Sequence, residues 1–351
     1  MTTMRDVAHQ AGVSVKTVSR VVNKDRSVRA ETAARVSRVI QALDYVPDPA
    51  ARMMRRGRSG VLGLISDDVT TTTYAVEVIR GVQDACAQEG ILLLISNTRG
   101  QPDLASSAAR ALVAWRADGL IFATRYLRVL DELPTGLDVT PVLLVNCVAP
   151  RGDRPSLVPD DFGGSHGATT HLIALGHRNI GLVSINPRIM AAERRAAGFK
   201  AAMADHGLIV SHETVQSGQH FEADGEPFTV AEAVDRLLAV RPGVTAILCG
   251  TDAIAMRVGN VLRARGLRVP QDMSVVGFDN FLMIVEGLDP PLTTVALPYY
   301  EMGRAAVAHF GRDDGQLQHV FPCPLVVRES CGPPREAATA AVSLTDSARS
   351  G

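Results

Sequence analysis

Apolar residues at the start of the chain recur with the spacing of three short amphipathic helices. The stripes are formed by Met4, Val7, Ala8 and Ala11 in the first, by Val15, Val18 and Val22 in the second, and by Val36, Val39, Ile40 and Leu43 in the third, which covers about 31–43. Thr3 and Asp6 have the spacing of a capping box, and Gly12 suits the end of the first helix. Three short helices with a tight turn after the first predict a helix-turn-helix.

Beyond residue 60, short apolar runs alternate with amphipathic segments. The runs predict buried parallel strands over Val61–Ser66, Ile91–Asn97, Gly119–Ala123, Pro141–Asn146, Ile180–Ser184, Val244–Gly250 and Met273–Phe278. The segments predict helices near 74–89, 104–115, 163–175, 190–206, 230–240 and 252–265. This alternation comes in two blocks, so we expect two doubly wound parallel-sheet halves with a cleft between them. Ligands bind at the carboxyl ends of the strands in such sheets.

The net charge of −1 conceals a strong asymmetry along the chain. Residues 1–60 hold 12 Lys and Arg against 5 Asp and Glu, a net charge of +7. The remaining residues hold 24 bases against 32 acids, a net charge of −8. A basic head on an acidic body indicates a polyanionic partner for the head. A basic face that is merely solvated is the alternative.

Composition excludes several classes of protein. The 351 residues, 46% of them apolar, suffice for one large and one small domain. No apolar run is long enough for a membrane span, and the N-terminus lacks a secretion signal, so we expect a cytoplasmic protein. The five cysteines have no CxxC or zinc spacing and are interpreted as reduced thiols.

The sequence contains no motif that indicates an enzyme. It has no GxGxxG, Walker loop, HExxH or GxSxG pattern. His166 and His171 are five residues apart, which does not place two imidazoles on one helical face, and the nine histidines form no ligand set. We therefore expect no catalytic residues, no metal and no cofactor.

The second helix of the head carries residues suited to DNA. Lys16, Arg20 and Asn23 lie opposite its apolar stripe, and Lys or Arg can donate to guanine O6 and N7 in the major groove. Ser14 can cap this helix, and Ser or Thr hydroxyls can hold phosphates. Val15 lies at the edge of the stripe, where it either contacts a thymine methyl group or belongs to the core.

A short, well-marked segment follows the third helix. Asp48 is a good N-cap, Pro49 suits the first helical position and Gly57 suits a left-handed stop. The roughly eight residues between them fall short of the ~12–15 that an isolated helix needs in water. The segment is either a helix that forms only when something packs against it or an ordered linker.

The run from Met4 to Asn23 resembles the signature of the LacI/GalR family of bacterial transcription regulators. Landmarks along the body resemble the same family, among them Gly250-Thr-Asp252, Val275-Val-Gly-Phe-Asp279 and Leu325-Val-Val-Arg328. The resemblance implies a small all-α helix-turn-helix DNA-binding head and an α/β periplasmic-binding-protein-like effector domain. We place the helix-turn-helix at 1–46, a hinge helix and linker at 47–60, the effector-binding and dimerisation domain at 61–333, and a disordered tail at 334–351.

The resemblance also assigns DNA-binding residues. In the family the segment after the third helix is a hinge helix that folds on DNA, and a Leu in it is inserted into the central base step. Here Met54 stands in place of that Leu and can still act as an apolar wedge. Asp48 stands where the family usually has Asn. The predicted DNA-binding set is Ser14, Val15, Lys16, Thr17, Arg20, Asn23, Arg52 and Met54.

The same resemblance implies an effector site. Arg195 matches an arginine that grips the ligand, and Asp279 matches a carboxylate that accepts hydrogen bonds from it. Thr251 and Asp161 replace the usual Asn at their positions. The predicted effector-binding set is Tyr74, Asp161, Arg195, Phe221, Thr251, Asp252 and Asp279.

We therefore predict a dimeric repressor that binds a pseudo-palindromic double-stranded DNA operator. A small-molecule effector would control it, and a cleft with Arg, Asp and an aromatic residue suits a sugar. The rival interpretations are a solute-binding protein without a DNA role and an enzyme of a doubly wound class.

Overall fold

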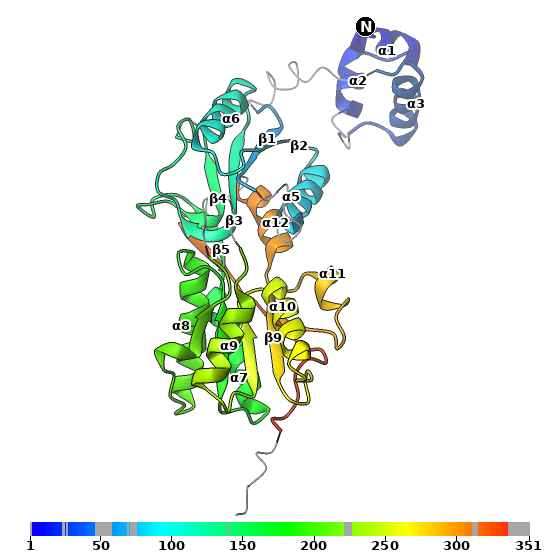
Figure 1. Cartoon of the computed structure of the whole chain (residues 1–351). Helices are drawn as coiled ribbons and strands as arrows, with labels where there is room; N and C mark the ends of the chain where they lie inside the picture. Colours follow the sequence, from blue (N-terminus) through cyan, green and yellow to red (C-terminus); the bar gives the residue numbers. More distant parts are fainter. Residues whose placement is uncertain are drawn as a thin grey trace, which may run out of the picture.

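The computed structural model describes residues 2–22, 25, 27–45, 58–68, 70, 76–138, 140–220, 227–310 and 315–335. In Figure 1 the head contains the three predicted helices, α1 (Met4–Ala11), α2 (Val15–Val22) and α3 (Ala30–Ala42). The capping box forms as expected, because Asp6 N donates to Thr3 Oγ1 and Thr3 N donates to Asp6 Oδ2. Gly12 ends α1 with a φ of 62°, in the left-handed region that favours glycine.

The head has a small hydrophobic core of its own. Its buried members come from all three helices and from the turn after α3: Val7, Ala8, Ala11, Val18, Val36 and Tyr45. Val15 is 42% exposed and lies outside this core. The sequence left the place of Val15 open, and its exposure means that its side chain is available to a partner of α2.

The body contains two six-stranded sheets. Each sheet, together with the helices that pack on it, is called a lobe. The first has the strand order β11-β5-β4-β3-β1-β2 and the second β12-β10-β9-β8-β6-β7. The first-lobe elements are β1 (Val61–Ser66), α5 (Val76–Glu89), β2 (Leu92–Asn97), α6 (Pro102–Ala114), β3 (Gly119–Val129), β4 (Val142–Val148), β5 (Ser156–Pro159), α12 (Tyr299–His309) and β11 (Gln318–Phe321). The paired strands of this sheet are parallel, as the runs of apolar residues predict.

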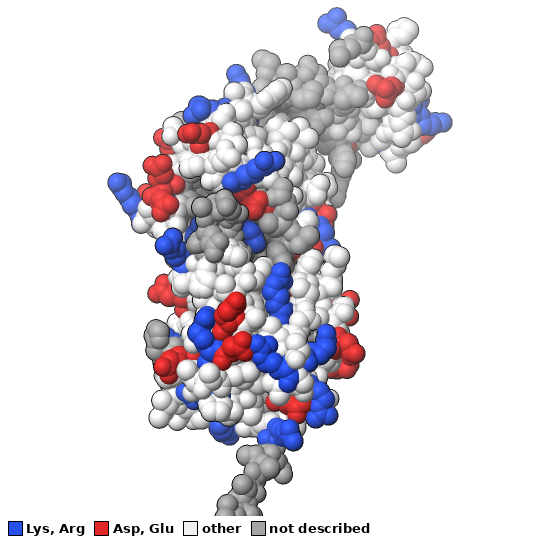
Figure 2. All heavy atoms as spheres, in the orientation of Figure 1, with Lys and Arg blue, Asp and Glu red and all other residues white. Residues whose placement is uncertain are grey.

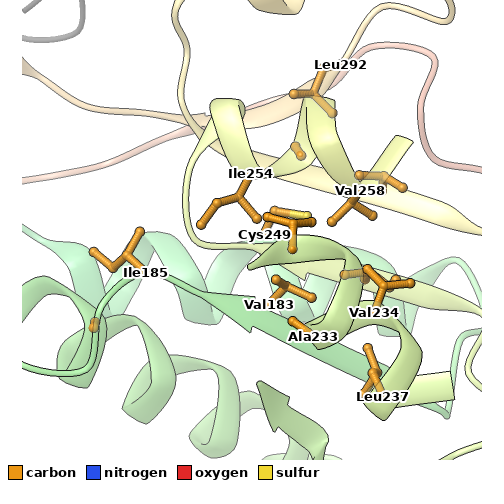
Figure 3. Close-up of a cluster of buried hydrophobic side chains, with 14 of the residues drawn as sticks. Val183, Ile185, Ala233, Val234, Leu237, Cys249, Ile254, Val258 and Leu292 are labelled. Carbon is orange, nitrogen blue, oxygen red and sulfur yellow. The ribbon is translucent and has the colours of Figure 1, made fainter. Parts of the chain in front are cut away.

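The second lobe repeats the same βα alternation. Its elements are α7 (Asp161–Ala174), β6 (Ile180–Ser184), α8 (Met190–Asp205), η1 (His212–Thr214), β7 (Val215–Ser217), α9 (Val230–Val240), β8 (Ala246–Cys249), α10 (Asp252–Ala264), β9 (Ser274–Asp279), α11 (Leu282–Val285), β10 (Thr293–Ala296) and β12 (Leu325–Val326). Among the named strands of the described residues in this sheet, β12 alone pairs antiparallel, with β10. Figure 3 shows part of its core, where Val183 and Cys249 on adjacent strands pack against Val234 and Leu237 of α9 and Ile254 of α10.

The two lobes are not two consecutive stretches of chain. After β10 the chain returns to the first lobe, where α12 packs beside α5 (Figure 1) and β11 pairs with β5. It then crosses back to form β12. The α5–α12 contact is close, because a Cβ on Gly81 would collide with the carbonyl oxygen of Tyr300. The two doubly wound halves are confirmed, and this interleaving places three chain crossings between them.

Several predicted elements differ from the structure in extent. The strands at β1 and β6 match at both ends, whereas β3 continues to Val129 and is six residues longer than expected. Its pairing with β4 shifts register between Ala123 and Arg128, and Leu127 packs into the core of the second lobe. Apolar patterning does not predict β5, β7 and β10–β12, which have only two to four residues, nor α11 and α12.

Parts of two predicted segments lie outside the described residues. These are residues 47–57 of the segment predicted as a hinge, and 336–351 of the predicted tail. Pro334 and Arg335 are described, and Arg335 pairs with Asp272 at 3.3 Å.

Candidate functional site

The start of α2 forms an exposed polar surface. Ser14 caps the helix, since Thr17 N donates to its Oγ at 3.1 Å, and the two hydroxyls are also hydrogen-bonded at 2.9 Å. Ser14, Val15 and Lys16 are all exposed. One turn of helix therefore presents two hydroxyls, one apolar side chain and one cation on the surface that leads into α2.

Arg20 lies one turn further along the same helix. Its Nε is 3.7 Å from Asp25 Oδ2, and about half of the arginine side chain is exposed. A surface ion pair of this length is weak, so Arg20 can exchange it for another anion at little cost. The predicted contacts Asn23, Arg52 and Met54 lie outside the described residues.

The body differs from the head in its surface charge. Figure 2 shows basic and acidic side chains interspersed on the visible face of the body. The net charge of −8 beyond residue 60 is the sum of 24 bases and 32 acids over the whole of that stretch. A mixed surface is less attractive to a polyanion than the exposed cations of α2.

A second candidate site is a cavity between the two lobes, which we call the inner cavity. Its lining comes from β3, β4 and α12 of the first lobe and from α7, α8, the β7–α9 loop, α10 with its cap, and β9 of the second: Arg125, Tyr126, Leu127, Asn146, Asp161, Ala191, Arg195, Gln219, Phe228, Thr251, Ala253, Asp279 and Tyr299. Four predicted effector residues, Asp161, Arg195, Thr251 and Asp279, therefore lie together. The enclosed space is about 20 Å³, which holds about one water molecule.

Arg195 of α8 is the central cation of this cavity and is only 4% exposed. Its Nε donates to Asp161 Oδ1 at 2.7 Å, its Nη1 donates to the carbonyl oxygen of Gly250, and its guanidinium lies 3.7 Å from the centre of the Phe278 ring. Burial opposes the charge, but the neighbouring Asp161 and Asp279 outweigh it and raise the pKa of Arg195. The guanidinium is thus a fixed positive charge. It is hydrogen-bonded to the Asp161 carboxylate and attracts the Asp279 carboxylate electrostatically.

Two buried oxygen atoms in the lining have no donor among the described residues. One is Oδ2 of Asp161, whose Oδ1 is already taken by Arg195. The other is Oδ1 of Asn146. The orientation of this amide is fixed, because Nδ2 faces only acceptors: the carbonyl oxygens of Thr124 and Arg125 and the hydroxyl of Tyr299. Buried acceptors of this kind are normally satisfied, so both are available to a ligand that donates hydrogen bonds.

Asp279 ends β9 in a strained conformation. Its φ is 127°, and the next residue, Asn280, has a φ of 58°. Asn146, across the cavity, has a φ of 59°. Such residues concentrate at functional sites, where the surrounding structure holds them in place. Burial, reinforced by the nearby Asp252, raises the pKa of Asp279 well above its usual range, and burial likewise raises the pKa of Asp161.

Thr251 and Asp252 play different roles although they are adjacent. Thr251 lines the cavity and caps α10, with Ile254 N donating to its Oγ1. Asp252 is fully buried, does not line the cavity, and accepts hydrogen bonds from Thr294 Oγ1 and Phe281 N. Its carboxylate is therefore already satisfied by the protein. A contact between Asp252 and the effector stays a prediction, and we do not use it in the proposed ligand contacts.

The remaining predicted effector residues, Tyr74 and Phe221, lie outside the described residues. The structure supplies other rings instead. Phe228 lies at one side of the cavity with the Arg257 guanidinium 3.8 Å from its ring centre, and Tyr126 has Arg125 at 4.6 Å. These residues were missed, because nothing in their local sequence marks them.

Asn146 and Tyr299 were also missed, for different reasons. Asn146 ends a strand that the sequence predicted, so the rule that ligands bind at carboxyl strand ends could have found it. Tyr299 begins α12, which the sequence analysis did not predict, and reaches the cavity only because the chain crosses back to the first lobe. Burial raises the pKa of the Tyr299 hydroxyl, which keeps it a neutral donor and acceptor.

A larger cavity of about 770 Å³ adjoins the inner one and shares Asp279 and Tyr299 with it. It lies between the first turns of α5 and α12 and the exposed α11, and its walls include Leu282, Met283 and Pro298. We call it the outer cavity. Asn146 and Asp161, which carry the two acceptors without donors, line the inner cavity and not the outer one.

Neither a metal site nor a membrane span is found in the described part of the chain. No three His, Cys, Asp or Glu side chains in these residues gather as metal ligands would. None of the helices in the same residues combines the length and apolar character that crossing a bilayer requires.

Comparison with known proteins identifies the family. Residues 3–48 match the bacterial regulatory proteins of the lacI family, and residues 169–331 match a periplasmic binding protein-like domain. The chain is 36% identical over 333 residues to the sucrose operon repressor of Shigella flexneri, covering 93% of this chain and 99% of that protein. The chain belongs to the LacI family. This confirms the resemblance found in the sequence.

Solved structures of LacI-family proteins have the same fold. A LacI-family transcriptional regulator from Rhizobium etli superimposes with a TM-score of 0.72 at 34% identity, covering 78% of this chain and all of that one. The complex of the regulator CelR with cellobiose gives a TM-score of 0.65 at 27% identity, covering 94% of this chain and all of that one. The predicted fold class, a helix-turn-helix head on a two-lobed α/β domain, is confirmed.

Proposed function

We propose that this LacI-family protein is a transcriptional repressor whose affinity for operator DNA is controlled by a sugar bound in the inner cavity. The observation that carries the proposal is the pair of buried acceptors, Asn146 Oδ1 and Asp161 Oδ2, which lack donors inside a cavity that also holds Arg195. A polyol supplies hydroxyl donors to both acceptors and acceptors to the guanidinium.

The head supplies the DNA contacts. In this proposal Lys16 and Arg20 donate to base edges, Ser14 and Thr17 hold phosphates, and the exposed Val15 contacts a thymine methyl group. Asn23, Arg52 and Met54 complete the contact set by family resemblance. Two copies of the head, related by the two-fold axis of a homodimer, would bind a pseudo-palindromic operator. Such a protein acts in the cytoplasm, where the operator is.

The cleft supplies the coupling between ligand and DNA. The inner cavity holds about one water molecule, whereas small-molecule sites usually have about 300–1,000 Å³. A sugar that contacts both buried acceptors needs more room than this cavity encloses, so in this proposal the two lobes move apart to admit it. Three chain crossings join the lobes, so a change in their separation also displaces the segments that cross between them. The ligand shifts DNA affinity by its differential affinity for the two lobe arrangements.

Two known proteins support a sugar as the effector class. The similar protein from Shigella flexneri is named for the sucrose operon, and the structure of CelR holds cellobiose. Calorimetry of the full-length protein against sucrose, cellobiose, fructose and glucose, with adenine and guanine as nucleobase controls, tests the class. We expect binding of at least one sugar. Binding of a nucleobase alone would overturn the sugar assignment.

The rival function is a solute-binding protein without a DNA role. A gel shift after selection of bound sequences from a random duplex pool separates the two. We expect the selected sequences to share a symmetric consensus. The fraction of this duplex that the protein retains should change when the sugar identified by calorimetry is added. Failure of the full-length protein to retain any duplex at low salt would favour the rival. The similar proteins are repressors, and we propose no enzymatic activity.

A further inference from the structure

The turn that follows β9 places Asp279 in the inner cavity. Asp279 has a φ of 127° and Asn280 has a φ of 58°, so two consecutive residues without glycine's freedom adopt left-handed backbone angles. A turn of this kind keeps its shape only when its neighbours fix it. Two side chains outside the cavity do so.

The first is Asp252, at the start of α10. Its Oδ2 accepts a hydrogen bond from Phe281 N at 2.7 Å, and its Oδ1 accepts one from Thr294 Oγ1 at 2.5 Å. The carboxylate lies directly against β9, because a Cβ on Gly277 would collide with Oδ1. Asp252 thus ties the end of the turn to β9 and β10.

The second is Arg328, just after β12. Its Nη2 donates to Asn280 Oδ1 at 2.8 Å, while its Nη1 donates to the carbonyl oxygen of Leu292 at 2.9 Å. Its own backbone N–H donates to Thr293 Oγ1 at 2.9 Å. The middle of the turn is therefore held from the C-terminal side of the lobe, by a residue nearly fifty positions away.

We propose that Asp252 and Arg328 are positioning residues, which clamp the turn 279–281 so that the Asp279 carboxylate faces the effector. The proposal rests on the function proposed above, and it assigns Asp252 a role through Asp279 in place of direct contact. Both Asp252 oxygens are occupied and the side chain has no exposed surface. Its neighbours Thr251 and Ala253 line the cavity, whereas Asp252 is not among the lining residues.

The clamp can be tested without a ligand by hydrogen exchange, followed by mass spectrometry of a peptide that covers 279–282. Asp252→Ala leaves Phe281 N–H without its acceptor, so we expect about tenfold faster exchange in this peptide. Asp252→Asn should restore slow exchange, because the amide oxygen accepts from Phe281 N while the Thr294 hydroxyl rotates to accept from the amide. Arg328→Ala should show the same acceleration, and it provides the second variant should Asp252→Ala fail to fold.

Leu262→Ala is the matched control, since Leu262 is fully buried on the same helix and has no contact role in the turn. It should lower stability without selectively accelerating exchange at 279–282. Equal exchange at 279–282 in Asp252→Ala and Leu262→Ala variants of equal thermal stability would overturn the clamp.

A double-mutant cycle then tests positioning of the ligand contact. Sucrose binding, or binding of whichever sugar of the panel proves tightest, is measured for Asp252→Ala, Asp279→Ala and the double variant. We expect about tenfold weaker binding for Asp252→Ala alone and no further loss when it is added to Asp279→Ala. Additive losses would overturn positioning through Asp279. If no sugar binds the wild-type protein, the proposed function fails, while hydrogen exchange still decides the clamp.

Discussion

The two candidate sites of this protein are built in opposite ways. The surface of α2 comes from residues 14–20, which one helix presents to solvent. The inner cavity collects residues from Arg125 to Tyr299, buried between two lobes and partly held in strained backbone conformations. A local, exposed site depends on its own side chains, whereas a non-local, buried site depends on everything that positions it. Substitutions should therefore affect the two regions differently.

The largest expected effect is that of Arg195→Met, at the centre of the cavity. It leaves the buried Asp161 without its partner, and loss of one member of a buried ion pair destabilises a protein by about 3–5 kcal/mol. Urea unfolding of the body should show this loss. Lys200→Ala, on the exposed side of the same helix, is the control and should stay within about 0.5 kcal/mol of wild type. A small effect of Arg195→Met would mean that the carboxylates are held neutral by protons instead.

The next effect concerns pH. Burial raises the pKa of Asp252 from 3.8 to about 7, so the folded protein binds a proton here that the unfolded chain releases above pH 4. The stability that the protein has with Asp252 protonated is fully present below pH 4 and is lost as the pH rises through 7. The free energy of unfolding of wild type minus that of Asp252→Asn should thus fall between pH 4 and 7. A difference that rises over this range would contradict the raised pKa.

In the head, the expected changes concern sequence preference and leave the fold intact. Lys16→Ala and Arg20→Ala should each relax preference at their operator bases by roughly 5- to 150-fold. Sequence selection with the purified variants measures this. Arg38→Ala, exposed on α3, should leave the consensus unchanged. An unchanged consensus for Lys16→Ala and Arg20→Ala would exclude α2 as the recognition helix.

The smallest expected effect is that of Thr3→Ala, which removes the capping box of α1. Loss of such a cap lowers the free energy of unfolding by about 1 kcal/mol. This is a large share for the head, because a small core provides little stability. The head should lose DNA binding at a lower temperature while the unfolding of the body is unchanged. Thr3→Ser, which retains the hydroxyl, should behave as wild type. A shift in the unfolding of the body would show that head and body do not unfold independently.

The sequence predicted the head almost residue by residue, because its signals are local. A cap at Thr3, a left-handed stop at Gly12 and stripes of valine three and four residues apart each act within one or two turns of helix. The strands of the body were found for the same reason, as continuous apolar runs. The short β10–β12 were not, because two to four residues carry no periodicity, and pairing with distant strands is what makes them strands.

The cavity shows what local signals cannot supply. Family resemblance placed Arg195, Asp161 and Asp279 in one site. The chain crossing that brings Tyr299 there exists only in the folded lobes. The same is true of the hydrogen bonds of the Asn146 amide, which leave its Oδ1 without a donor. Asp252 is the clearest case. Its position beside Thr251 suggests a ligand contact. Only the packing of α10 against β9 and β10 brings its carboxylate to its partners Phe281 N and Thr294 Oγ1. The sequence by itself determined which residues are charged, capped or apolar, because those properties belong to single residues and short spacings. The tertiary structure decided which of those residues face the cavity, because facing depends on partners tens to hundreds of residues away.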